Sequence, residues 1–267
     1  MLRICSLCVA ASLMLAQPPP AAQQAAAITD DQVTDLRLGG GLSQRVLYVA
    51  PARPRATLVM LPGGTGDVGV RRDGDLRHDD NFVVRTRAAW VARGYAVLIP
   101  DTIDRANLRG LRSSPAYQRV IDGLVTYARA RAAAPVFLLG TSQGTIAAVN
   151  GAAHARPGSI AGLVLTETVS LPGKLSKETI FAANPQSVRV PALVVANRDD
   201  ACDVALPSMA PRVAAAMTGS PEARVLMVEG GVQRSGSACG SLSPHGYYGI
   251  EEQVIGAIIA WLQAHGG

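Results

Sequence analysis

The sequence predicts an α/β protein, a three-layer α/β/α sandwich with a mostly parallel central sheet. Short, continuously apolar runs rich in Val, Ile and Leu alternate with longer segments of helical pattern along the chain. Strands buried on both faces have this composition, because helices cover both sides of a parallel sheet. The length of 28–267 suits one α/β domain better than two. We therefore expect a single domain over 28–267.

The expected strands recur at regular intervals and are bounded by Gly, Pro and Asp residues. They cover 44–50, 56–61, 95–101, 135–140, 160–169, 191–197 and 223–229. The Pro-Ala-Arg-Pro-Arg segment between the first two strands indicates a hairpin-like connection. Only residues 170–190 separate the fifth expected strand from the sixth, which leaves no room for a sizeable cap domain.

The expected helices lie between these strands. They cover 81–94, 114–132, 143–156, 205–218 and 249–264. Asn81 is a candidate N-cap for the first helix, and Gly94 is its expected end. Ser114 and Pro115 are a typical opening for the second.

The N-terminus resembles a secretory signal peptide. Arg3 precedes an apolar run over 4–16, followed by a stretch rich in Pro, Ala and Gln. The run is too short to cross a bilayer core of about 30 Å as a helix. We expect 1–27 to be a signal peptide with a disordered flank, and the mature protein to be periplasmic or secreted, with no stable membrane insertion. Candidate cleavage points follow Ala16, Ala22 and Ala27.

The net charge of +5 comes almost entirely from arginine, since Lys174 and Lys177 are the only lysines. The arginines occur in scattered pairs without a basic block, whereas a nucleic-acid surface usually concentrates its charge. We therefore expect a small-molecule substrate and no nucleic-acid partner. The oligomeric state stays open.

A Gly-Thr-Ser-Gln-Gly segment, 140–144, directly follows an apolar strand and opens a helix of small residues. A strand, a tight turn and a helix form the setting of a nucleophile elbow. The strained turn requires nearly side-chain-free neighbours, which Gly140 and Gly144 supply. The positive end of the following helix also favours an oxyanion there. Ser142 is therefore the candidate nucleophile.

A serine nucleophile needs a histidine base and a carboxylate that orients it, in the chain order Ser, acid, His. His154 ends the helix that begins at the nucleophile, and His265 lies in the C-terminal tail. His245 lies between the last strand and the last helix and is the candidate base. Three candidate acids follow the strand at 191–197, namely Asp199, Asp200 and Asp203.

Several stretches carry a family resemblance: VMLPGGTGDVG, NFVVRTR, LLGTSQGT, NRDDACDV and SPHGYYGIE. From about residue 40 onward, the chain resembles the α/β-hydrolase superfamily, in particular a lidless, exported bacterial branch related to dienelactone-hydrolase-like esterases. In such proteins the acid commonly precedes a cysteine in a D-x-C pattern. The resemblance therefore implies Asp200 as the acid, with Asp199 as the alternative.

The resemblance also implies an oxyanion hole of two N–H groups. One belongs to Gln143, the residue after the nucleophile. The other should come from the Pro-Gly-Gly-Thr loop at 62–65, which replaces the usual His-Gly-x. Gly64 is the first candidate and Thr65 the second.

The same loop matches a dinucleotide fingerprint, G-x-G-x-x-G over 64–69. That motif holds a pyrophosphate only when its last glycine opens a helix. A polar, aspartate-rich segment follows here, and no acidic residue ends a strand about twenty positions later. We expect no nucleotide cofactor, and no other cofactor.

The cysteines predict a disulfide. Cys5 and Cys8 lie in the expected signal peptide, which leaves Cys202 and Cys239 in the mature chain. Two cysteines in an exported protein most often pair. A metal site built from these cysteines with Asp203 and His245 is the alternative, but it lacks a closely spaced ligand pair such as C-x-x-C. We expect no metal.

Together these features predict a serine hydrolase, a carboxylesterase for short-chain or small polar esters that works through a Ser-His-Asp triad. The alternatives are an inactive envelope binding protein on the same scaffold, or a peptidase or amidase of the same fold. Several arginines should lie toward the site, either to bind an anionic substrate group or paired with Asp79, Asp80 and Asp104. They are Arg71, Arg72, Arg105, Arg109 and Arg112.

Overall fold

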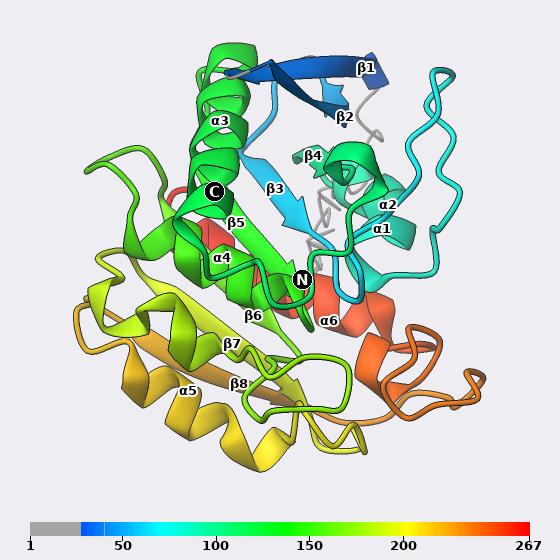
Figure 1. Ribbon diagram of the computed structural model, residues 1–267, viewed down its shortest axis with the longest axis vertical. Helices are drawn as coiled ribbons and strands as arrows, with labels where there is room; N and C mark the ends of the chain where they lie inside the picture. Colours follow the sequence, from blue (N-terminus) through cyan, green and yellow to red (C-terminus); the bar gives the residue numbers. More distant parts are fainter. Residues whose placement is uncertain (1–27, 40) are drawn as a thin grey trace, which may run out of the picture.

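The computed structural model describes 28–39 and 41–267 (Figure 1). The expected signal peptide and its cleavage points lie outside the described residues. In the described part of the chain, no helix combines the length and the apolar composition needed to cross a membrane.

In the described residues, eight strands form one sheet in the order β1-β2-β4-β3-β5-β6-β7-β8. The sheet is mostly parallel, as the sequence predicted; among these eight strands, β1 with β2 and β2 with β4 are the antiparallel pairs. The strands are β1 (Ile28–Gly39), β2 (Leu42–Pro51), β3 (Thr57–Leu61), β4 (Ala96–Pro100), β5 (Val136–Thr141), β6 (Gly162–Thr166), β7 (Ala192–Asn197) and β8 (Ala223–Val228). The carboxyl ends of β3, β5, β6 and β7 meet at one edge, where α/β proteins build their sites.

Two expectations for the first strands were wrong. Strand β1 was not predicted, because an edge strand needs no apolar run and this one carries several aspartates. The segment 51–55 is not a hairpin, since β2 pairs with β4 through Leu47 and Ile99 and the chain passes beyond that position to form β3.

Helices cover both faces of the sheet (Figure 1). The helices α3, α4 and α5 pack on one face, and α1, α2 and α6 pack on the other. Their bounds are α1 (Phe82–Arg85), α2 (Arg87–Ala92), α3 (Pro115–Arg131), α4 (Gly144–Ala153), α5 (Ala210–Ala216) and α6 (Glu251–Ala264). This arrangement is the predicted three-layer sandwich, and 41–267 contain no separate cap domain.

The helix expected over 81–94 is broken in two at Thr86. The Thr86 hydroxyl donates a hydrogen bond to the carbonyl of Phe82 at 2.6 Å and accepts one from the Trp90 indole at 3.1 Å. Such local side-chain bonds compete with a regular helix. Asn81 precedes the first piece, but its side chain makes no capping bond.

Two other elements are shorter than expected. Strand β6 stops at Thr166 because Glu167 adopts a left-handed conformation, with φ of 46°. The helix expected over 205–218 is reduced to α5, preceded by a 3₁₀ turn that opens at Pro207.

Candidate functional site

Ser142 lies in the tight turn between β5 and α4, with a left-handed φ of 50°. The glycines beside it permit this turn. A Cβ atom on Gly144 would lie 1.9 Å from the carbonyl oxygen of Leu61, and one on Gly140 would lie 2.5 Å from the Gly144 carbonyl. Because real Cβ atoms never approach so closely, the elbow requires glycine at both positions.

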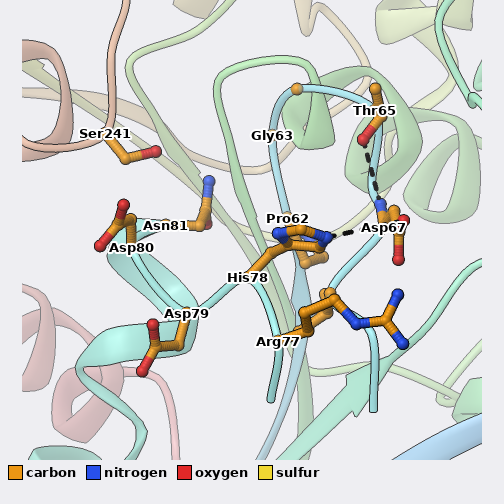
Figure 2. A pocket seen from close by; sticks show the side chains of 12 residues that line it. Pro62, Gly63, Thr65, Asp67, Arg77, His78, Asp79, Asp80, Asn81 and Ser241 are labelled. Atoms are coloured by element: carbon orange, nitrogen blue, oxygen red, sulfur yellow. Dashed lines mark hydrogen bonds and ion pairs between the residues drawn. The ribbon is translucent and has the colours of Figure 1, made fainter. Parts of the chain in front are cut away.

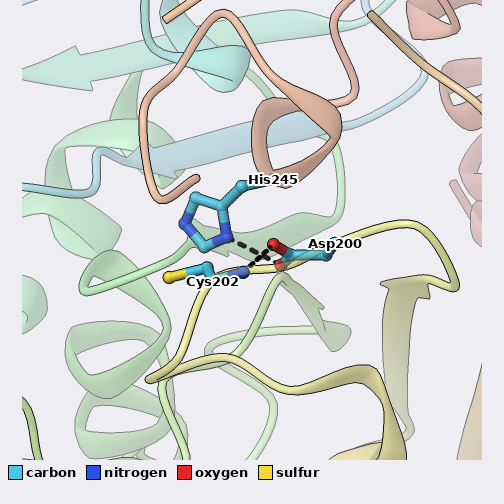
Figure 3. Close-up of side chains that lie close together, drawn as sticks. All are labelled: Asp200, Cys202 and His245. Carbon is cyan, nitrogen blue, oxygen red and sulfur yellow. Dashed lines mark hydrogen bonds and ion pairs between the residues drawn. The ribbon is translucent and has the colours of Figure 1, made fainter. Parts of the chain in front are cut away.

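Ser142, His245 and Asp200 form a continuous hydrogen-bonded chain. The Ser142 Oγ lies 2.9 Å from His245 Nε2. Figure 3 shows the next bond, in which His245 Nδ1 lies 2.8 Å from Asp200 Oδ2. His245 is 4% exposed and Asp200 is 5% exposed. The arrangement can remove the proton from the serine and stabilise the resulting imidazolium.

The other candidate acids and bases have different partners. Asp199 Oδ2 accepts a hydrogen bond from the backbone of Gly230 at 2.6 Å. His154 and His265 each bond through Nδ1 to a carbonyl oxygen one turn earlier. Of the acids that follow β7, Asp200 is the one bonded to His245.

The loop that carries His245 is fixed by residues that the sequence analysis did not identify. The Ser243 hydroxyl oxygen accepts a hydrogen bond from the His245 backbone at 3.1 Å. From α1, the Arg85 guanidinium bonds to the carbonyl of Gly246 and lies 2.9 Å from the Glu251 carboxylate. Arg85 stands in the quoted stretch NFVVRTR, but its role depends on contacts 161 and 166 residues apart.

A disulfide joins Cys202 to Cys239, the pair expected from the sequence, with an S–S distance of 2.00 Å. Cys202 follows Asp200 closely, and its backbone N–H donates to Asp200 Oδ1 at 2.8 Å (Figure 3). The bridge therefore links the loop after β7, which carries Asp200, to the segment before His245. Because the sulfurs are bonded to each other, neither can serve as a thiolate ligand in the cluster with Asp203.

The loop after β3 lies against the nucleophile. A Cβ atom on Gly63 would lie 2.9 Å from Ser142 Cβ. Within the described ranges, no protein acceptor bonds to the N–H groups of Gly64, Thr65 or Gln143. These free donors can stabilise an oxyanion, and both loop candidates, Gly64 and Thr65, meet that condition.

Arg112 supports this loop from behind. Its side chain is buried, with the residue 1% exposed, and its Nη2 donates to the Pro62 carbonyl at 3.2 Å. Burial lowers the pKa of its guanidinium below the ordinary value. The backbone N–H of Leu108 also bonds to the Thr65 carbonyl, at 2.9 Å. Arg112 thus lies toward the site, as expected, but its guanidinium bonds to the loop backbone.

The other arginines divide into two groups. Arg109 lies at the site, with Nη2 3.8 Å from where a Cβ of Gly64 would be. Arg71, Arg72 and Arg105 line a different cavity of about 430 Å³ beside Asp101. In the described part of the chain, none of the five arginines expected near the site forms an ion pair with Asp79, Asp80 or Asp104.

A polar cavity of about 330 Å³ adjoins the site through Gly63 and Gly64 (Figure 2). His78 and Asp67 lie side by side in its lining, with Nε2 and Oδ2 3.9 Å apart. Its lining residues are Pro62, Gly63, Gly64, Thr65, Asp67, Val68, Arg77, His78, Asp79, Asp80, Asn81 and Ser241.

Glu167 is a buried carboxyl group that the sequence analysis missed. It follows β6 and is 0% exposed. Burial and the neighbouring Asp200 raise the pKa of Glu167 well above its ordinary value. The signal available in the sequence was an acidic residue directly after an apolar strand, at the edge where the site forms.

Comparisons with known proteins identify the fold. No family model matches the chain, and no curated protein sequence matches it. A dienelactone hydrolase from Anabaena variabilis superposes with a TM-score of 0.60 at 16% identity, covering 88% of this chain and 98% of its own. Est1E from Butyrivibrio proteoclasticus superposes with a TM-score of 0.59 at 14% identity, over 88% of this chain and 98% of Est1E. The Pyrococcus furiosus esterase Pf2001 superposes with a TM-score of 0.62 at 11% identity, over 89% of this chain and 93% of the esterase. The chain thus has the α/β-hydrolase fold.

Proposed function

We propose that the protein is a serine hydrolase that cleaves carboxylic esters. The observation that carries the proposal is the hydrogen-bonded chain from Ser142 through His245 to Asp200, placed beside free backbone donors. The solved structures of similar fold include esterases and dienelactone hydrolases, which supports the same class of reaction.

In the proposed reaction, Ser142 Oγ attacks the ester carbonyl carbon while His245 Nε2 takes the hydroxyl proton. Asp200 holds the imidazole in the required tautomer and stabilises its charge. The N–H groups of Gln143 and of Gly64 or Thr65 bind the tetrahedral oxyanion. The C–O bond to the alcohol then breaks, the alcohol leaves with the proton from His245, and water hydrolyses the acyl-enzyme by the same steps.

The cavity beside the site supports small polar esters as substrates. Its volume of about 330 Å³ and its polar lining suit short acyl groups better than long alkyl chains. Arg109, whose Nη2 lies 3.8 Å from where a Cβ of Gly64 would be, is the cation that we expect to face an anionic substrate group. We also propose that the enzyme acts in the periplasm or outside the cell, where an oxidising environment maintains the disulfide.

The test is hydrolysis of p-nitrophenyl acetate combined with labelling by a fluorophosphonate. Wild type should react with both, and Ser142→Ala should lose about 10⁴- to 10⁶-fold in turnover and all labelling. Ser208→Ala is the matched control, because Ser208 is exposed and lies in a 3₁₀ turn before α5. A folded wild type that shows neither reaction would indicate an inactive binding protein instead. Faster cleavage of the matched p-nitroanilide would indicate a peptidase or amidase.

A further inference from the structure

The proposed reaction leaves one buried acidic group without a role, namely Glu167. Its left-handed backbone turns the side chain inward at the end of β6, next to the acid loop. Carboxylates are rarely buried without partners, because removing the charge from water costs free energy. Glu167 therefore requires a physical explanation.

The contacts of Glu167 converge on Asn197, the last residue of β7. Glu167 Oε1 accepts a hydrogen bond from the Asn197 N–H at 3.0 Å. The Asn197 carbonyl accepts from the backbone of Asp200 at 3.0 Å, and its amide nitrogen donates to the carbonyl of Pro244 at 3.0 Å. Through one residue, Glu167 thus holds the acid and the segment that carries His245.

The second oxygen of Glu167 has a different environment. Among the described residues, Oε2 is fully buried and has no hydrogen-bond partner. The polar side chains near the Glu167 carboxyl are Asp200, from the turn after β7, and Tyr247, from the His245 loop, whose hydroxyl donates to the Val195 carbonyl at 3.1 Å. His245 meets Asp200 on the other side.

An ionised Glu167 would place two buried carboxylates together. Among the described residues, no Lys, Arg or His pairs with Glu167. Neighbouring carboxyl groups in a buried site do not both ionise readily, and Asp200 is the one bonded to a histidine. Burial first, and then the charge of Asp200, raise the pKa of Glu167.

We propose that Glu167 is a neutral carboxylic acid and a positioning residue for the triad, which holds the Asn197 N–H with Oε1 and adds no second negative charge beside Asp200. Of the two buried carboxyl groups, Asp200 is then the ionised one. This role rests on the proposed function, but the protonation state does not.

Thermal unfolding of the full chain against pH tests the protonation state without any activity. A raised pKa means that Glu167 stabilises the fold fully below its unfolded pKa, about 4.3, and that this stability is lost as the pH rises through the folded pKa. Glu167→Gln removes that dependence. The Tm of this variant should therefore rise relative to that of wild type between pH 4.5 and 8.5, by about 3–5 °C for each pH unit between the unfolded and the folded pKa.

Glu178→Gln is the matched control for this experiment. Glu178 is also buried, but its carboxylate accepts hydrogen bonds from the backbone N–H groups of Gly110, Arg112 and Ser113. The Tm of Glu178→Gln should lie below that of wild type over the whole pH range, without the relative rise expected for Glu167→Gln. A constant Tm difference between wild type and Glu167→Gln over the same range would overturn the neutral form.

The positioning role is tested by pH profiles of kcat/KM. Glu167→Met cannot accept from Asn197 and should lower kcat by about 10- to 100-fold with little change in KM. Glu167→Gln should restore most of that loss and keep the acid limb of the profile in place. A Gln variant whose acid limb moves down by more than about 0.5 pH unit would show that a charge had been removed. A Met variant with lower Tm but full kcat would reduce Glu167 to a packing residue. If wild type itself is inactive, the proposed function fails, and the unfolding experiment still decides the protonation state.

Discussion

The two halves of the candidate site are held in different ways. The half with Asp200 and His245 is fixed by side chains from distant elements, through the disulfide, the Arg85–Glu251 pair and Asn197. The half with the loop after β3 is fixed by charged side chains that bond to the backbone, one buried and one half-buried. Arg112 holds Pro62, and the Asp101 carboxylate accepts from the backbone of 68–70.

This difference follows from what each half must do. A histidine and its acid require accurate side-chain orientation, and cross-links between loops supply it. An oxyanion hole requires N–H groups that are fixed in place but free of protein acceptors. The loop must therefore be held through other groups, here the Pro62 carbonyl and the N–H groups of 68–70. The comparison predicts that substitutions in the half with Asp200 and His245 impair proton transfer. Substitutions in the half with the loop after β3 should instead impair oxyanion stabilisation.

The largest effect should come from the acid. Asp200→Asn should lower kcat by about 10⁴-fold, because the amide favours the wrong imidazole tautomer. Asp199→Asn is the neighbouring control and should stay within about tenfold of wild type, since Asp199 bonds to Gly230. Steady-state kinetics with p-nitrophenyl acetate measures both. The reverse ranking would refute the assignment of Asp200.

The next effect should come from Arg112. Arg112→Met removes the donor to Pro62 and should lower kcat by about 10- to 100-fold, because the loop donors lose their position. Arg109→Met, the nearby control, should change KM more than kcat, because Arg109 lies at the edge of the site. Thermal unfolding should accompany the kinetics. If Arg112→Met reduces the Tm but leaves kcat normal, Arg112 stabilises the fold without positioning the loop donors, and the proposed difference between the halves is refuted.

The disulfide should have a smaller effect, on the acid and base half alone. Its loss by the double change Cys202→Ser and Cys239→Ser should lower the free energy of unfolding by roughly 2–4 kcal/mol, since the bridge spans 37 residues. Under mild reductant, activity should fall before the sheet unfolds, as followed by circular dichroism. Two free thiols in protein purified without reductant would contradict the bridge.

The sequence predicted the parts of the molecule that depend on local pattern. The apolar strands predicted the sandwich, and the paired glycines around Ser142 indicated the elbow, because both signals lie within a few residues. The supports of the site were missed. Arg85 and Glu167 act on partners 161 and 30 residues away, and only the folded topology brings them together. The support of the loop by Arg112 was missed for the same reason, since the sequence does not distinguish a buried arginine from an exposed one.

The smallest effect concerns acyl chain length, which reports on the half with the loop after β3. The cavity that adjoins this loop is polar and holds about 330 Å³, so each added methylene beyond a short chain gains little burial there. Across p-nitrophenyl esters from two to twelve carbons, kcat/KM should be highest at the short end and fall severalfold by about eight carbons. His78→Leu makes the lining more apolar and should flatten that decline, while Leu206→Ala, at an exposed position far along the chain before α5, should leave it unchanged. Specificity constants that rise beyond about ten carbons would mean that the acyl group binds along an apolar surface and not in this cavity.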